Sequence, residues 1–127
     1  MGSEQRHVMH VDEVEWVVVP DMPHHHGMLG KHLSNATGLE NLPVSYEVQS
    51  YKVGGYQEPA VHEGGFHLMY VLQGEGEYTI GGKTYPIRPG SPVMIPPHTS
   101  HGMHNTGKSE LVMFAVHGSA AKLSQGK

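Results

Sequence analysis

The chain has 127 residues, a net charge of −4 at pH 7 and only 8 Lys and Arg. This length fits one domain with a substantial core, and so few basic residues argue against nucleic acid or a membrane surface as a partner. The absence of Cys excludes a disulfide framework and thiolate chemistry. Residues 1–7 lack the apolar run of a secretory signal, and no segment approaches the roughly 20 apolar residues that span a bilayer. We therefore expect a soluble, cytoplasmic protein.

The N-terminal third is predicted to hold one strand and a long loop. Residues 14–19 are rich in Val and end at Pro20, which indicates a short strand. Residues 24–43 begin with three consecutive His, contain several Gly and show no periodicity. We expect a loop there, with at most one turn of helix.

Strand character returns at residue 44. Val44, Tyr46 and Val48 share one face of an extended segment, whereas Tyr51 and Val53 take the opposite phase. A change of phase inside a run of period two predicts a bulge or a bend.

The central segment is predicted to contain a covered strand and a hairpin. Residues 68–72 are apolar on both faces, which favours a central strand packed on both sides. Residues 78–87 alternate on either side of Gly81-Gly82, which is typical of a hairpin with a two-residue turn. Two further strands are expected before a polar tail, at residues 93–95 and 111–117.

The expected fold is all-β and forms a single domain. The sequence has 17 Gly and 9 Pro between short strand-like runs, and no segment with a helical period exceeds about two turns. Regularly spaced short strands of this kind indicate a barrel or jelly roll. We divide the chain into an N-terminal strand and loop (1–43), a barrel core (44–118) and a polar tail (119–127). The first segment is a candidate dimer arm or barrel lid.

Histidine is the outlying residue type, with 12 in the chain, although imidazole has no special role in packing. A single His on a strand is usually structural or exposed, but two clusters here lie at strand edges bounded by Gly or Pro. His62 and His67 are five residues apart and would point to opposite faces of a regular strand, yet Gly64-Gly65 permits a bulge that resets the phase.

The second cluster contains His98, His101 and His104. A spacing of three reverses the face each time, so if His101 points inward its two neighbours do not. Three imidazoles drawn from the two clusters suit a first-row transition metal and leave coordination positions open. His24, His25 and His26 are interpreted as exposed loop residues, with capping of the barrel mouth or adventitious metal binding as alternatives.

The second cluster resembles a motif of the cupin superfamily, G-x5-P-x-G-x2-H-x3-N. Gly90, Pro96, His101 and Asn105 match it in type and spacing, while His98 stands at the usual Gly. The resemblance covers about residues 44–117 and implies a cupin-type antiparallel β-barrel, or jelly roll. It also implies that His101 is a metal ligand.

The first cluster departs from the family's other motif, G-x5-H-x-H-x4-E-x6-G. Alignment on Gly74 places His62 at the second His, His67 at the Glu and Ala60 at the first His. The resemblance therefore implies a metal held by His62, His67 and His101, three neutral imidazoles without a carboxylate. A degenerate cupin that has lost its metal is the alternative that Ala60 suggests.

A divalent metal on three imidazoles keeps a net charge of +2, which favours chelating anions such as enolates, keto acids, hydroxy acids or catecholates. All-histidine cupins include Fe(II) dioxygenases that cleave β-diketones or oxidise thiols. By analogy we expect a mononuclear metal-dependent oxidoreductase, a dioxygenase with Fe(II), although Zn, Ni, Mn, Cu or Co also fit. A non-redox lyase, isomerase or hydrolase, and a cupin that binds a metal or small ligand without catalysis, are the alternatives. The expected partners are a small-molecule substrate, dioxygen and a second copy of the chain, paired through residues 8–19.

Several residues are assigned weaker roles. Glu58 shares strand parity with Ala60 and His62, so it is a candidate extra ligand, against the alternative of an exposed edge carboxylate. His117 shares a face with Leu111 and is interpreted as a pocket residue or as a solvent-exposed strand end. The other candidate pocket walls are Met69, Val71, Tyr78, Ile95, Met103 and Phe114.

Overall fold

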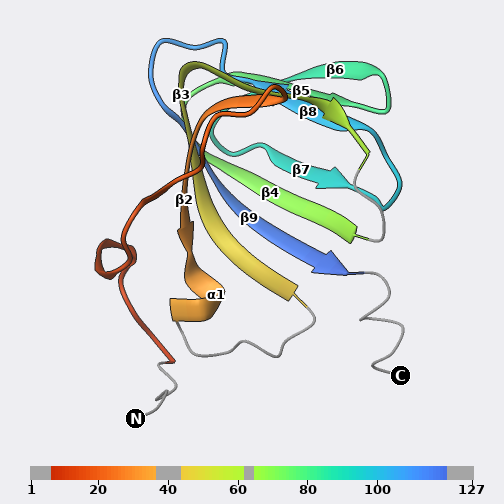
Figure 1. The fold of residues 1–127 in the computed structure, drawn as a ribbon. Coiled ribbons are helices and arrows are strands. Elements are labelled where there is room, and N and C mark those ends of the chain that lie inside the picture. The colour runs from red at the N-terminus through yellow and green to blue at the C-terminus, as the bar shows by residue number, and fades with distance from the viewer. Residues whose placement is uncertain (1–6, 37–43, 62–64, 120–127) are drawn as a thin grey trace.

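The computed structural model describes residues 7–36, 44–61 and 65–119 and consists mainly of strands in one curled antiparallel sheet (Figure 1). The sheet bends into a half-barrel with β5, β6 and β8 in one layer and β4, β7 and β9 in the other. The all-β, antiparallel fold predicted from the sequence is confirmed. Over the described ranges, no helix has the length and apolar character needed to traverse a bilayer.

The strands follow the order β6-β5-β8-β3-β9-β4-β7 across the sheet, and β2 also pairs with β3. A 3-10 helix at Val11–Glu13 and the short helix α1 (Leu33–Ala36) are the helical segments of the described chain. The strands are β1 (Val17–Val18), β2 (His25–His32), β3 (Val44–Ala60), β4 (Gly65–Gln73), β5 (Gly76–Ile80), β6 (Lys83–Ile87), β7 (Pro92–Ile95), β8 (His101–His104) and β9 (Leu111–Ser119).

The core lies between the two layers and is built from alternate residues of each strand. On β9 the side chains of Leu111, Met113 and Ala115 are fully buried, and so are their partners Tyr51 and Gln49 on β3 and Met69 and Val71 on β4. This is the period-two pattern of a sheet with one face in the core. It also means that odd-numbered residues of β9 point into the barrel, which places His117 on the inner face.

The N-terminal third differs from its prediction. Only Val17 and Val18 of the expected first strand are paired, whereas residues 25–32, expected in a loop, form an eight-residue strand along β3. Gly27 has a φ of 79° and lies where the register between β2 and β3 shifts. It therefore interrupts the alternation of inward and outward side chains by which a strand is recognised in a sequence. The turn of helix is present as α1, and residues 37–43 lie outside the described part.

The hairpin prediction is confirmed, but the prediction of a doubly covered β4 is wrong. Gly81 and Gly82 adopt φ values of 59° and 83°, as a two-residue turn between β5 and β6 requires. On β4 the side chains of Leu68, Tyr70 and Leu72 are 41%, 48% and 52% exposed. Their apolar character therefore reflects the outer surface of the sheet and not a second core.

The irregularities of β3 lie further along than predicted. Residues 44–51 pair with β9 without any shift of register. Val48 to Tyr51 are all buried, so this part of β3 is covered on both faces. Apolar residues on both faces therefore look in the sequence like a change of phase, although none is present. The register with β8 shifts between Gln57 and Ala60, where two residues of β3 oppose one of β8. This bulge lies next to the histidines.

Candidate functional site

Three imidazoles converge at one end of the barrel, where β4 and β8 begin and β9 ends. The ring centroid of His67 lies 4.8 Å from that of His101 and 4.4 Å from that of His117. The pairing explains this, since His67 is the cross-strand partner of His117 on one side and of Ile95 on the other. Ile80 pairs with His101 in the same way, so apolar side chains flank the cluster.

His101 is 3% exposed, and its Nδ1 lies 3.0 Å from the carbonyl oxygen of Thr99. A neutral imidazole that donates its Nδ1 hydrogen to this carbonyl keeps the lone pair on Nε2. A backbone carbonyl that fixes the tautomer in this way is typical of metal-binding histidines. His101 is therefore oriented as a ligand would need to be.

The bulge in β3 sets the position of His101. Pro59 and Glu58 cross over Gly102, where an added Cβ would lie 2.6 Å from Pro59 N and 2.5 Å from the carbonyl oxygen of Gln57. Gly102 is thus required by close backbone approach. Because the bulge absorbs one residue, Ala60 becomes the partner of His101.

The same bulge removes the parity argument for Glu58. Its side chain is exposed and borders a cleft on the outer side of the sheet together with Glu77 and His104. Glu58 is not brought to the histidines, so the structure does not place it as an extra ligand. A parity count fails wherever a strand contains an unrecognised bulge.

His117 is supported by polar side chains from β3. Gln49 is buried, and its Nε2 donates to Glu47 Oε2 at 2.8 Å and lies 3.5 Å from His117 Nε2. Glu47 in turn lies 3.2 Å from His32 Nδ1. The amide group facing Glu47 must be the donor, because a carbonyl oxygen there would meet a carboxylate. Sequence reasoning missed Gln49 and Glu47, although both share strand parity with Tyr51 in the core.

Two of the three predicted metal ligands, His67 and His101, lie in the described part of the chain. Among residues 7–36, 44–61 and 65–119, no three His, Cys, Asp or Glu are grouped so that they could hold a metal ion. His62 lies outside these ranges, so the trio of His62, His67 and His101 stays a prediction. Two imidazoles bound to one ion at about 2.1 Å, roughly 90–110° apart, have ring centroids about 4.5–5.2 Å apart. The 4.8 Å between His67 and His101 falls in that interval, so these two fit a shared ion.

The predicted pocket walls divide between the two faces of the sheet. Phe114 lies on the outer face, in ring contact with Tyr46 at 6.1 Å, because even-numbered residues of β9 point away from the barrel. The others lie inside the core between the two layers: Met69, Val71, Tyr78, Ile95 and Met103.

The remaining histidines are placed outside the barrel interior. His104 is exposed on the outer face opposite Tyr56, and His98 is exposed in the turn before β8. His24 is exposed, while His25 and His26 belong to β2 and are half-buried. His26 Nδ1 lies 2.6 Å from Asp21 Oδ2. A hydrogen bond from the backbone of Gly27, together with His26, lowers the pKa of Asp21.

Asn105 ties the end of β8 to its neighbours. Its Nδ2 lies 3.0, 3.1 and 2.9 Å from the carbonyl oxygens of Tyr51, Lys52 and Ser109, and its Oδ1 accepts from Gly107 N at 2.9 Å. The side chain is 1% exposed. Asn105 is a structural residue that fixes the strand carrying His101.

Comparison with known proteins identifies relatives of one kind. A family profile described as "Cupin domain" matches residues 47–117. An oxalate-binding protein of Thermotoga maritima is 40% identical over 55 residues, which make up 43% of this chain and 46% of that protein. An L-ectoine synthase of Aliivibrio fischeri is 31% identical over 81 residues, or 61% of this chain and 60% of that protein. The matches thus span less than two thirds of either relative.

The fold is matched over a larger share of the chain. The crystal structure of a predicted oxalate decarboxylase from Thermotoga maritima has a TM-score of 0.77 at 26% identity. That alignment covers 88% of this chain and 98% of the other. The half-barrel therefore belongs to a recurrent architecture.

Proposed function

The chain belongs to the cupin family, and we propose that it holds one divalent transition metal through His62, His67 and His101 and acts on a small chelating anion. The reaction we assign to it is oxidation by dioxygen, with Fe(II) as the metal. The observation that carries this proposal is the convergence of the His67 and His101 rings inside the barrel. The order of residues in the two cupin motifs supplies the third ligand.

The residues at this end of the barrel suit an anionic ligand. When bound, Fe(II) would supply positive charge and redox chemistry, and neutral imidazoles leave its charge uncompensated. Thr99 holds the tautomer of His101, and Gln49 contacts His117 beside the cluster. Ile80 and Ile95 flank the cluster on two sides, and their apolar side chains strengthen electrostatic attraction to an anion.

A non-redox role is the second candidate, and the curated relatives favour it. One relative is named for binding oxalate, a chelating dianion, and another is named L-ectoine synthase. Either name is consistent with a site that binds a small anion without consuming dioxygen. The same pocket chemistry serves both candidates, so dioxygen consumption separates them.

The test uses untagged protein reconstituted anaerobically with Fe(II). Oxygen uptake is recorded with acetylacetone, catechol, 2-oxoglutarate and oxalate as probes. We expect uptake with at least one probe, its loss in His67→Ala, and its retention in His104→Ala, a matched control on the outer face. If the protein binds oxalate but takes up no oxygen with any probe, the oxygenase assignment is wrong and the non-redox role is supported. Equal behaviour of His67→Ala and wild type would overturn both.

A further inference from the structure

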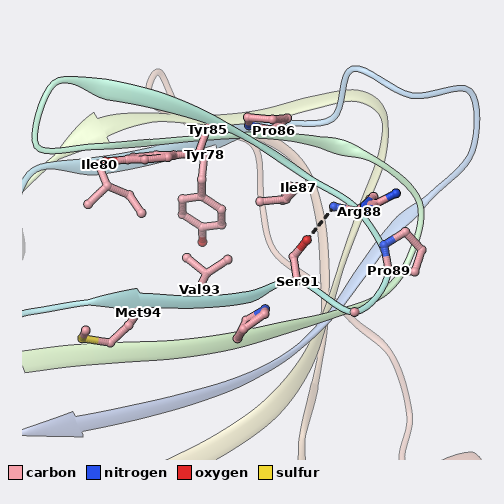
Figure 2. Close-up of a pocket in the computed structure, with 12 residues that line it drawn as sticks. Tyr78, Ile80, Tyr85, Pro86, Ile87, Arg88, Pro89, Ser91, Val93 and Met94 are labelled. Carbon is pink, nitrogen blue, oxygen red and sulfur yellow. Dashed lines mark hydrogen bonds between the residues drawn. The ribbon is translucent and has the colours of Figure 1, made fainter.

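A second region of the barrel has the features of a binding site. The sheet order leaves β6 and β7 as unpaired edges, and a cleft of about 590 Å³ lies between them (Figure 2). This volume is within the range of about 300–1,000 Å³ found for small-molecule pockets. Tyr78 and Ile87 enter the cleft from one layer and Val93 from the other, so apolar side chains form its inner part.

The two edges are unsuited to pairing with a peptide strand. In the hairpin, the backbones of Lys83, Tyr85 and Ile87 hydrogen-bond to β5, so the backbone groups of Thr84 and Pro86 lie at the free edge of β6. On β7, Ser91 and Val93 bond to β4, so Pro92 faces outward. A proline at each edge interrupts the row of N–H donors that strand addition needs. The cleft therefore favours a small molecule over an added strand.

Tyr78 places a hydroxyl group inside this cleft. Its side chain is 3% exposed, and its hydroxyl points across the cleft toward Val93 (Figure 2). No residue of the described chain forms a hydrogen bond with that hydroxyl. The hydroxyl is open to the cleft, so its hydrogen is available to an acceptor atom on a bound molecule.

Arg88 provides charge at the end of the cleft beside the turn from β6 to β7, where its side chain is exposed. It is the one charged side chain among the twelve residues that line the cleft, and its guanidinium forms no ion pair with any described residue. Its backbone N–H donates to Ser91 Oγ at 3.0 Å, which fixes the turn that joins β6 to β7. A guanidinium is suited to a carboxylate, which it binds through two parallel hydrogen bonds.

We propose that the cleft binds an elongated organic acid. The carboxylate pairs with Arg88, and the hydrocarbon chain lies against Ile87 and Val93. A carbonyl or hydroxyl oxygen partway along the chain accepts the Tyr78 hydrogen. Tyr85 is the partner of Tyr78 and lies three residues before Arg88, which corresponds to about 10 Å along the strand. The accepting oxygen therefore stands several carbons from the carboxylate.

The test measures calorimetric affinities of 6-oxooctanoate, octanoate and octan-1-ol, with and without a metal chelator. We expect wild type to bind the oxo acid about fivefold tighter than octanoate, since a neutral hydrogen bond contributes about 1 kcal/mol. Tyr78→Phe should remove that preference. Arg88→Gln should weaken both acids by about tenfold and leave octan-1-ol unaffected. Lys83→Gln, which removes a charge from β6 outside the cleft, is the matched control.

The outcomes separate this site from the metal. Affinities that survive the chelator and depend on Arg88 support the cleft. Binding that disappears with the chelator, or that Arg88→Gln and Lys83→Gln reduce equally, overturns it, as does the absence of binding at millimolar ligand. Melting temperatures of the variants verify that each one is folded. Because the cleft is assigned without the metal, its failure leaves the proposed oxygenase unaffected.

Discussion

Replacing Asn105 by Ala should strongly destabilise the fold although this side chain contacts neither a metal nor a substrate. The substitution leaves the carbonyl oxygens of Tyr51, Lys52 and Ser109 without their donor and the Gly107 N–H without its acceptor. Each buried group left unpaired costs about 1–3 kcal/mol, and two of the three carbonyls are only partly buried. We therefore expect a loss of about 3–5 kcal/mol from the free energy of unfolding.

For a chain of this length the loss corresponds to a fall in Tm of roughly 12–20 °C, measured by differential scanning calorimetry. Thr106→Ala, an exposed change next to it, is the control and should shift Tm by no more than about 2 °C. Asn105→Asp should be less stable than Asn105→Ala at neutral pH, because a carboxylate oxygen would face three carbonyl oxygens. A loss below about 1 kcal/mol in Asn105→Ala would refute the assignment of these hydrogen bonds as a structural tie.

Three further changes follow from the same geometry. His98 has a φ of 61°, so His98→Gly should stabilise the fold by about 0.5–1 kcal/mol in urea unfolding, whereas His104→Gly within β8 should destabilise it. Burial raises the pKa of Tyr51. The free energy of unfolding should therefore stay constant up to about pH 10 and decrease at higher pH, where the unfolded state loses the Tyr51 proton more readily. The decrease should be smaller in Tyr51→Phe, and identical slopes for the two proteins would contradict this. His67→Glu should retain metal because a carboxylate is also a ligand, yet bind anionic probes more weakly than wild type, whereas His67→Ala should lose metal by elemental analysis.

Sequence reasoning succeeded where local patterns decide the structure. The Gly81-Gly82 hairpin and the spacing from Gly90 to Asn105 are short-range features, and neither depends on distant contacts. The positive φ of His98, 61°, was not predicted, although His98 stands at the Gly of the family motif.

The predictions that were wrong share one cause, because they depend on contacts between strands that are distant in the sequence. The bulge at Glu58 depends on the close approach of β3 to Gly102, which lies more than 40 residues away in the chain. The strand over residues 25–32 is stabilised by pairing with β3 and is interrupted by Gly27. Gln49 reaches His117 because β3 and β9 are neighbours, and sequence spacing alone contains no such information.

Anomalous diffraction at metal absorption edges would show whether three imidazoles bind one metal. Crystals of untagged protein, purified without a nickel column, would be measured at the Fe and Zn edges. A three-imidazole site predicts one peak inside the barrel, about 2.0–2.2 Å from a ring nitrogen of His62, His67 and His101. A metal present in the crystal with any one of these three side chains directed out of the barrel would contradict it.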